Sequence, residues 1–515
     1  MGDETPLPQS AIQIIQSLLT RKEAARTATL SKSWRSAWLT SPHLELDDSD
    51  FERNFSYGEE EDDDFDEDDY DEDEEESGDH PAIDEFSVFA KKTVQRYEDS
   101  NLKIESFRLR MNYYKRCKWD DNLIGLAYEL IVRALRLGAT CLDLQLTGFS
   151  DERPILPHEV FEAENLVELS VEGYFIHDLV LDQRVRCSKL ESLTLNDVRI
   201  KRDMVSRIIS VCRLIKKLSL CKIKDNRLQS LGWVCDYLID FHMLTSLKLQ
   251  GMRLDSAFLD DLSFRFPNVK DLSLEFCYSR NKIQICSHSL ERLELLTQGG
   301  WKPKVVLDVP RIRKLAFKCS EIPSVVFISD SKELYESLVS HVCYSFTHRW
   351  FLNVSKLLTE LRRSKISLYL SVRSSVDMPM SNYDVEDLDG LPSSRHQLEH
   401  LMVETNYMRS LTCYAFFDGL FRLCCPKIIT QRYPRRGMYH GHKTNNDFLS
   451  KMLERGTKGV FSNSCNFMYG LHDLEGVYVK PYDDDGDDDV WILKFNLHKH
   501  DTETVQFHLK WKSTS

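Results

Sequence analysis

From about residue 100 onward the apolar residues recur in one frame, in which an apolar residue is followed three and five positions later by further apolar residues, mostly leucine. The steps between the third members of successive frames are 37, 25, 24, 25, 29, 25, 21 and 22 residues. The frames are Ile104/Phe107/Leu109, Cys141/Leu144/Leu146, Leu166/Leu169/Val171, Leu190/Leu193/Leu195, Ile215/Leu218/Leu220, Leu244/Leu247/Leu249, Val269/Leu272/Leu274, Leu290/Leu293/Leu295 and Ile312/Leu315/Phe317. This period predicts a solenoid of short parallel strands whose alternate side chains enter a shared core.

The segments between the strands carry helical patterns. Asp203 is placed to cap a helix with its apolar face from Met204 to Cys212, and Asp255 precedes a second apolar pattern from Phe258 to Leu262. Looser frames follow around Ile366 to Leu370 and Leu398 to Val403. We therefore expect an α/β fold with parallel strands on the concave face and helices on the convex face.

The C-terminal region departs from simple repetition. Residues 446–456 have the pattern of a capped helix that ends at Gly456, and residues 474–479 that of a strand. Residues 491–497 and 505–511 alternate apolar and polar side chains, which predicts two further strands. These elements are expected to form a strand-rich cap that covers the open edge of the sheet.

A compact helical module precedes the repeats. Apolar residues recur at near-helical spacing after Pro8, residues 20–23 form a turn and a helix start, and Trp34 and Trp38 lie four residues apart on a third helix. A module of about 40 residues is too small to bury its own apolar surface, so some of these groups need a partner.

This module resembles the F-box, in the plant form that precedes leucine-rich repeats. The residues that carry the resemblance are Leu7-Pro8, Ile12, Ile15, Lys22–Thr27, Leu30-Ser31-Lys32, Trp34-Arg35 and Trp38. The sequence departs from the family pattern at Gln9 and Ser10, where acidic residues are usual, at Thr20, where proline is usual, and at Ser33, where arginine is common. The resemblance implies a three-helix F-box followed by a leucine-rich-repeat solenoid.

Four segments are predicted along the chain. They are an F-box over residues 1–45, an acidic disordered linker over 46–82, the solenoid over 83–410, and divergent C-terminal repeats with a strand-rich cap over 411–515. The linker is expected to be disordered because Glu59 to Asp79 contains 17 acidic residues and no basic one. Taking these 17 from the 82 acidic residues of the chain leaves 65 against 67 basic ones. The rest of the chain is thus near neutrality, which gives no case for a nucleic-acid partner.

Composition indicates an intracellular protein of the nucleus, the cytoplasm or both. A hydrophobic content of 42% and a charged content of 29% are those of a globular protein. No run of about 18 apolar residues is present, so no membrane partner is expected, and the N-terminus has no apolar signal core. None of the 14 cysteines belongs to a CxxC pair, so free thiols are expected.

The sequence carries no motif for catalysis, a cofactor or a metal. The segment 437–444 has its glycines too close together for a phosphate-binding loop, and His440 and His442 have no cysteine or acidic partners for zinc. The acidic run 483–489 lacks the downstream glutamate of a calcium-binding loop. The protein is therefore expected to be no enzyme and to hold no cofactor.

The family resemblance implies a substrate-recognition adaptor of a Skp–cullin–F-box ubiquitin ligase. In this hypothesis the F-box docks onto a Skp-type adaptor joined to a cullin, and the repeats hold an unknown protein substrate for ubiquitination. The alternative is a non-degradative leucine-rich-repeat protein that binds a partner or senses a ligand and is tethered through its F-box. The residues predicted to contact the adaptor, or to support that surface, are Leu7, Pro8, Ile12, Ile15, Leu30 and Trp34.

Substrate binding is assigned to the outward neighbours of the core leucines. They lie between the buried positions of each predicted strand, and their chemistry is a mixture of acidic, basic and hydroxyl groups that suits a protein partner. These candidates are Glu168, Ser170, Ser192, Thr194, Lys217, Ser219, Ser246, Lys248, Asp271 and Ser273.

Overall fold

The computed structural model describes two compact units, each of which is considered by itself. The first comprises Met1–Gln229 and Trp233–Leu244, and the second comprises Ser230–Gly232 and Thr245–Ser515. The described residues are 7–51, 81–112, 121–148, 153–177, 185–223, 242–251, 259, 262–277, 282–297, 304–344, 346–373, 391, 395–406, 410–434, 448–458, 471, 473–481 and 502–512. The predicted acidic run, Glu59 to Asp79, lies outside them.

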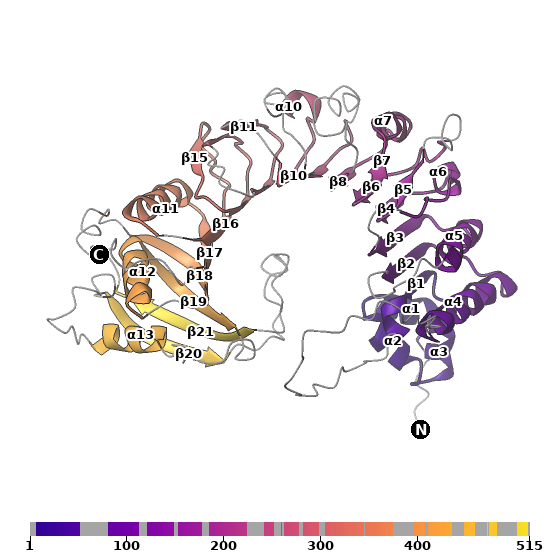
Figure 1. Ribbon diagram of the computed structural model, residues 1–515, viewed down its shortest axis with the longest axis horizontal. Coiled ribbons are helices and arrows are strands. Elements are labelled where there is room, and N and C mark those ends of the chain that lie inside the picture. Colours follow the sequence, from indigo (N-terminus) through magenta and orange to yellow (C-terminus); the bar gives the residue numbers. More distant parts are fainter. Residues whose placement is uncertain are drawn as a thin grey trace, which may run out of the picture. The chain divides into compact units, whose positions relative to one another are not determined.

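The first unit is built on parallel strands that pair in chain order. They are β1 (His43–Asp47), β2 (Ser106–Asn112), β3 (Cys141–Thr147), β4 (Glu168–Glu172), β6 (Ser192–Asn196) and β8 (Lys217–Cys221). A small parallel pair is formed by β5 (Phe175–Ile176) and β7 (Arg199–Ile200). Figure 1 shows the helices on one side of the main strands. They are α4 (Pro81–Asp99), α5 (Asp121–Arg136), α6 (Glu159–Glu162) and α7 (Arg202–Val211).

The strand pattern of the first unit follows the apolar repeat. Leu169 and Leu193 pair in register across β4 and β6, and both are buried. One frame was predicted in the wrong register, because Leu109 of β2 pairs with Leu144 and not with Leu146. The second frame is therefore Ala139/Leu142/Leu144. Leu142, Leu144 and Leu146 occupy every second residue of β3, so a pairing of Leu109 with Leu144 and a pairing with Leu146 both place leucines in the core. The alternation alone therefore does not distinguish the two registers.

The first strand was not predicted. β1 pairs in parallel with β2, with Leu46 opposite Leu109, and the short 3₁₀ helix η1 (Asp48–Phe51) follows it. β1 therefore spans the boundary predicted at residues 45 and 46, where the F-box was expected to give way to the linker. The Leu44-x-Leu46 alternation was its only signal in the sequence.

The second unit continues with parallel strands and ends in two antiparallel ones. The parallel strands are β9 (Ser246–Gln250), β10 (Asp271–Glu275), β12 (Arg292–Leu296), β14 (Lys314–Cys319), β16 (Glu336–Cys343), β17 (Lys365–Arg373), β18 (His396–Asn406) and β19 (Cys424–Pro434). The strands β21 (Thr502–Trp511) and β20 (Leu474–Pro481) then pair antiparallel at its end. Its helices are α10 (Leu262–Arg265), α11 (His348–Leu361), α12 (Ser410–Leu423) and α13 (Phe448–Lys458).

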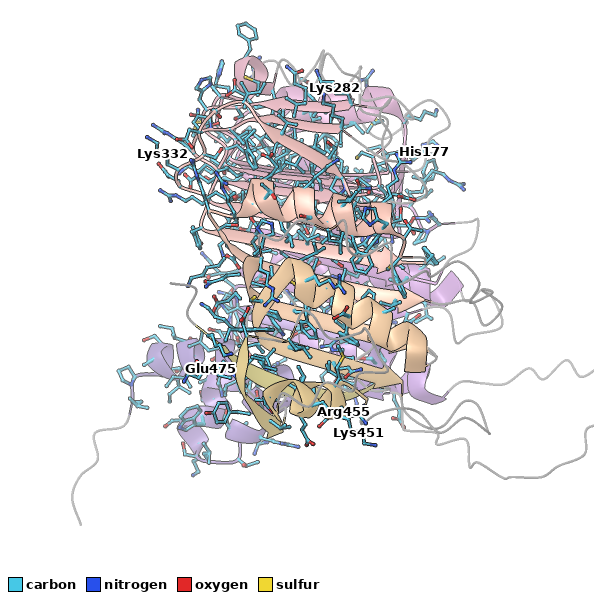
Figure 2. All side chains as sticks on the ribbon, turned by 90° about the vertical axis from the view of Figure 1, so that its left-hand side faces the viewer. His177, Lys282, Lys332, Lys451, Arg455 and Glu475 are labelled. Carbon is cyan, nitrogen blue, oxygen red and sulfur yellow. The ribbon has the colours of Figure 1, made fainter. Side chains whose placement is uncertain are left out.

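A second parallel sheet occupies part of the face where helices were expected. It consists of β11 (Lys282–Cys286), β13 (Lys304–Asp308) and β15 (Ser324–Phe327). Lys282, at the start of β11, projects from this sheet in Figure 2. The buried Ile283 and Ile285 alternate with polar residues, a period of two that favours a strand over a helix.

The helix predicted to be capped by Asp203 is present as α7, but it begins at a different residue from the one predicted. α7 begins at Arg202 with Lys201 as N-cap, so Asp203 lies within the first turn and is not the cap. The helix predicted after Asp255 has residues 252–258 outside the described part of the chain.

The elements predicted near the C-terminus are present where they are described, but the helix predicted to end at Gly456 is α13, which continues to Lys458. α13 buries Leu449, Met452 and Leu453, while Lys451 and Arg455 lie one turn apart on its exposed side (Figure 2). The strands expected at 474–479 and 505–511 are β20 and β21. The strand expected at 491–497 falls outside the described residues. Among the described strands, β21 lies between β19 and β20. The fold is mixed α/β, with N-terminal helices followed by long, mostly parallel sheet structure.

Candidate functional site

Three short helices form the N-terminal module: α1 (Gln9–Ser17), α2 (Arg21–Thr27) and α3 (Lys32–Leu39). A capping box starts α2, because the Thr20 side chain accepts the Glu23 amide while the Thr20 amide donates to Glu23 Oε2 at 2.9 Å. The Thr20 hydroxyl also donates to Glu23 Oε2, at 2.7 Å, and this bond together with that from the Thr20 amide lowers the pKa of the Glu23 carboxyl. Ser31 Oγ caps α3 by accepting the Trp34 amide. Thr20 therefore starts α2 by a side-chain cap at the position where the family pattern has proline.

The module has a small core that joins its helices. Ile12 is 1% exposed, and Ala24 and Ala37 are also buried. Gln16 Nε2 donates to Thr27 Oγ1 at 2.9 Å and to the Trp34 carbonyl at 3.2 Å, which ties α1 to α2 and α3. Ile12 was predicted as part of, or support for, the adaptor surface, and its burial leaves only the supporting role.

The outside of the module carries exposed apolar side chains. Leu18 is 81% exposed and Leu30 is 67% exposed, and of the 19 large hydrophobic residues exposed in the described parts, six lie within residues 7–30. These six form what we call the apolar surface: Leu7, Ile14, Ile15, Leu18, Leu19 and Leu30. So many exposed apolar groups on so short a segment are typical of a partner-binding surface.

The six predicted adaptor residues differ in exposure, and Ile12 is the buried one. Leu7, Pro8, Ile15 and Leu30 are exposed, whereas Trp34 is half-buried. Ile14, Leu18 and Leu19 were not among the predicted site residues. Their signal was the length of the apolar run, because residues adjacent on a helix point in different directions and cannot all face one core.

Hydrogen bonds fix the module to the first strands. Gln9 Nε2 of α1 donates to Thr40 Oγ1, at the C-cap of α3, at 2.6 Å, which holds the end of the module together. Beyond it, Tyr97 Oη of α4 donates to the Ser41 carbonyl at 2.7 Å. The Glu105 amide, just before β2, donates to the Pro42 carbonyl at 2.8 Å. The apolar surface is thus carried on a module attached to the start of the sheet.

The predicted substrate residues lie where the alternation placed them. In β4, β6 and β8 they are exposed or half-buried between buried leucines, and the same holds in β9 and β10. We call this side of the strands the open face. In the first unit Ser170 pairs in register with Thr194, and Thr194 with Ser219, which produces a row of hydroxyl groups.

The two units differ in how far these residues are already engaged. In the second unit Lys248 Nζ lies 2.5 Å from Glu275 Oε1, Arg292 Nη2 donates to Asp271 Oδ2 at 2.7 Å, and Ser273 Oγ donates to a Glu294 carboxylate oxygen at 3.1 Å. In the first unit the side chains of Ser170, Ser192, Thr194 and Lys217 have no hydrogen-bond or ion-pair partner among the described residues. The first unit therefore presents the more available polar groups.

The open face of β1 to β3 carries an ion-pair network. Arg108 Nε lies 2.8 Å from Asp143 Oδ2, and Arg108 Nη1 lies 3.5 Å from Glu45 Oε1. Arg110 Nη1 lies 3.7 Å from the same Glu45 oxygen. These charges largely neutralise one another, so the hydroxyl row on β4 to β8 is bordered by a balanced surface.

Neither a metal site nor a membrane-spanning helix is present in the described parts of the chain. They contain no group of three or more His, Cys, Asp or Glu side chains that could hold a metal ion. No helix in the same ranges is long and apolar enough to cross a membrane. The described cysteines are free thiols, and Cys424, one of the vicinal pair, is buried with its thiol donating to the Leu420 carbonyl.

Comparison with known proteins agrees with this architecture. No protein-family model matches the chain. An F-box protein of Arabidopsis thaliana is 23% identical over 219 residues, which is 42% of this chain and 44% of that protein. An F-box/FBD/LRR-repeat protein of the same plant is 22% identical over 363 residues, or 64% of this chain and 70% of the relative.

A third relative, an F-box/LRR-repeat protein of Arabidopsis thaliana, is 25% identical over 276 residues, which is 51% of this chain and 74% of the relative. The match to the first of these relatives spans less than half of that relative's length. The chain is thus distantly similar, at 22–26% identity, to Arabidopsis F-box and F-box/LRR-repeat proteins.

Proposed function

We propose that this protein is a substrate-recognition adaptor of a Skp–cullin–F-box ubiquitin ligase. The observation that carries the proposal is the apolar surface, because six apolar side chains on a capped, packed three-helix module are left exposed by the described parts of the chain. The distant similarity to F-box/LRR-repeat proteins supports a Skp-type adaptor as the partner that covers this surface. Such an adaptor would act in the nucleus, the cytoplasm or both.

In this function the chain positions the substrate and does not itself catalyse bond formation. The module would bind the Skp-type adaptor, and the open face would hold a protein so that one of its lysines lies near the conjugating enzyme. When the substrate lysine and the conjugating enzyme are held together, their reaction no longer depends on a chance encounter in solution. This proximity would raise the rate of ubiquitination without catalytic side chains in this chain. Ser170, Ser192 and Thr194 of this face, with Lys217 at their border, supply polar groups that have no partner among the described residues.

The test is co-purification of the full chain with a Skp-type adaptor and a cullin. Leu18→Glu and Leu30→Glu each place a charge on the apolar surface, and we expect either to weaken adaptor binding by about 30-fold or more, as loss of an interface hot spot does. Replacing Leu7-Pro8 by Ala-Ala should also weaken adaptor binding. Leu214→Glu is the matched control, since Leu214 is an exposed leucine of the same unit outside the module.

Adaptor binding that survives all three changes would contradict the proposal. A second measurement separates the alternative: in a reconstituted ligase, a captured partner should be ubiquitinated. Capture of the adaptor without ubiquitination of any bound partner would favour a non-degradative binding protein.

A further inference from the structure

A cavity of about 600 Å³ lies where the N-terminal module meets α4 and the first two strands. Figure 1 shows α4 beside the three short helices of the module. Leu19 belongs both to the lining of this cavity and to the apolar surface of the module. The cavity is therefore continuous with the apolar surface, and it lies outside the hydroxyl row on β4 to β8.

The cavity presents apolar side chains that a partner can reach. Leu19 is 37% exposed, Phe89 of α4 is 38% exposed, and Trp38 of α3 is half-buried. The Phe89 ring lies 5.2 Å from the ring of Phe51 in η1, which in turn lies 5.6 Å from the buried ring of Phe86. Phe89 is thus held in place by an aromatic contact while part of its ring remains open. Aromatic side chains of this kind are frequent anchors of protein interfaces.

Trp38 also supplies an accessible hydrogen-bond donor. Its indole N–H has no hydrogen-bond partner among the described residues, yet its Nε1 is not one of the polar atoms that are buried without a partner. Nε1 is therefore accessible to solvent, on a side chain that lines the cavity. An indole nitrogen can only donate, so the group that fits it is an oxygen acceptor.

Polar side chains complete the lining of the cavity. Ser17 and His43 are exposed, and Glu45 of β1 is paired with Arg108 of β2 at 3.5 Å. Exposed apolar side chains bordered by polar ones are typical of a protein–protein interface, which has an apolar centre and a polar rim. The mixed lining therefore favours a segment of a partner protein over a small apolar molecule.

We propose that the surface that binds the Skp-type adaptor extends from the module into this cavity and onto α4. The inference rests on the proposed function and adds to it a contact outside the three-helix module. An apolar side chain of the adaptor packs against Leu19, Trp38 and Phe89, and a neighbouring carbonyl or carboxylate oxygen accepts the Trp38 indole N–H. The adaptor is the occupant because Leu19 joins the cavity to the apolar surface that the adaptor covers in the proposed function.

The test measures the affinity of the full chain for a purified Skp-type adaptor by calorimetry. Phe89→Glu places a charge on the wall of the cavity, and we expect it to weaken binding by about tenfold or more, as loss of an interface anchor does. Val88→Glu is the matched control, because Val88 is 49% exposed on the same helix and does not line the cavity. Trp38→Phe keeps an aromatic ring but removes the donor, and it should weaken binding by about threefold to tenfold.

Equal affinities of Phe89→Glu, Val88→Glu and the unmodified chain would overturn the inference, and the proposed function would still stand if Leu30→Glu weakened binding. Failure of the unmodified chain to bind the adaptor would contradict both. Sedimentation of the chain alone tests another occupant, because self-association that Phe89→Glu abolishes would assign the cavity to a second copy and overturn the inference. Phe89 and Val88 are both exposed, so we expect both variants to keep the melting temperature of the unmodified chain.

Discussion

His341 of β16 is a buried histidine with both ring nitrogens engaged. Nδ1 lies 3.0 Å from the Cys319 carbonyl, and Nε2 lies 2.9 Å from Trp350 Nε1. The indole N–H can only donate, so Nε2 must accept and Nδ1 must carry the proton. This arrangement requires a neutral ring, and one residue thereby joins β14, β16 and α11 in the second unit.

At the residue scale we predict that the second unit loses stability as the pH falls. Burial lowers the pKa of His341, and the Cys319 contact and the Glu321 carboxylate act in the opposite direction without cancelling this effect. The unfolded chain therefore takes up a proton near the ordinary histidine pKa of about 6.5, while the folded chain resists it. The stabilisation is complete above that pH and declines below it.

Urea unfolding at pH 7.5 and pH 5.5 measures this dependence. His341→Ala should cost roughly 1–3 kcal/mol at the higher pH, because it leaves two buried groups unpaired, and should flatten the pH dependence. His288→Gln, at an exposed position of the same unit, serves as the control. A pH dependence that is unchanged in His341→Ala would refute the assignment.

At the scale of an element, the strands depend on leucines stacked in register. Leu193 of β6 lies between Leu169 of β4 and Leu218 of β8, and all three are buried. Leu193→Asp would place an unpaired charge in this stack and should cost several kcal/mol. We expect the first unit to lose its cooperative unfolding transition, and circular dichroism measured during unfolding checks this.

Thr194→Asp tests whether the effect belongs to the core or to the strand. Thr194 is the next residue, half-buried on the open face, so the same substitution there should cost less than about 1 kcal/mol. Equal losses at the two positions would show that the strand tolerates no acidic residue, and that burial is not the cause.

At the scale of the whole molecule, the acidic run is expected to be dispensable for stability. The seventeen acidic residues between Glu59 and Asp79 account for the formal net charge of −15, because the rest of the chain has 67 basic against 65 acidic residues. Deleting this run should leave the melting temperature and the affinity for a Skp-type adaptor almost unchanged, since such a composition forms few packed contacts. A marked fall in melting temperature on deletion would mean that the run packs against the folded units.

Because the chain is repetitive, its sequence alone predicts most of the fold. Each strand of a solenoid uses the same local pattern, so leucines such as Leu193 and Leu218 identify their own strands without knowledge of distant contacts. The same holds for the helical module, where the Thr20 and Glu23 spacing marks the start of α2. The predicted substrate positions also follow from this local rule, because strand side chains alternate between two faces.

Tertiary structure decided what local patterns leave undetermined. The register of β3 needed its neighbours, since Leu142, Leu144 and Leu146 satisfy two pairings. Burial of Ile12 and exposure of Leu18 depend on which side of α1 meets α3. Gln16 and Arg96, which are 80 positions apart in the sequence, line one cavity between the N-terminal helices and the first strands. Local periodicity determines the elements because backbone geometry repeats at short range, whereas sites depend on contacts between elements that no short stretch of chain encodes.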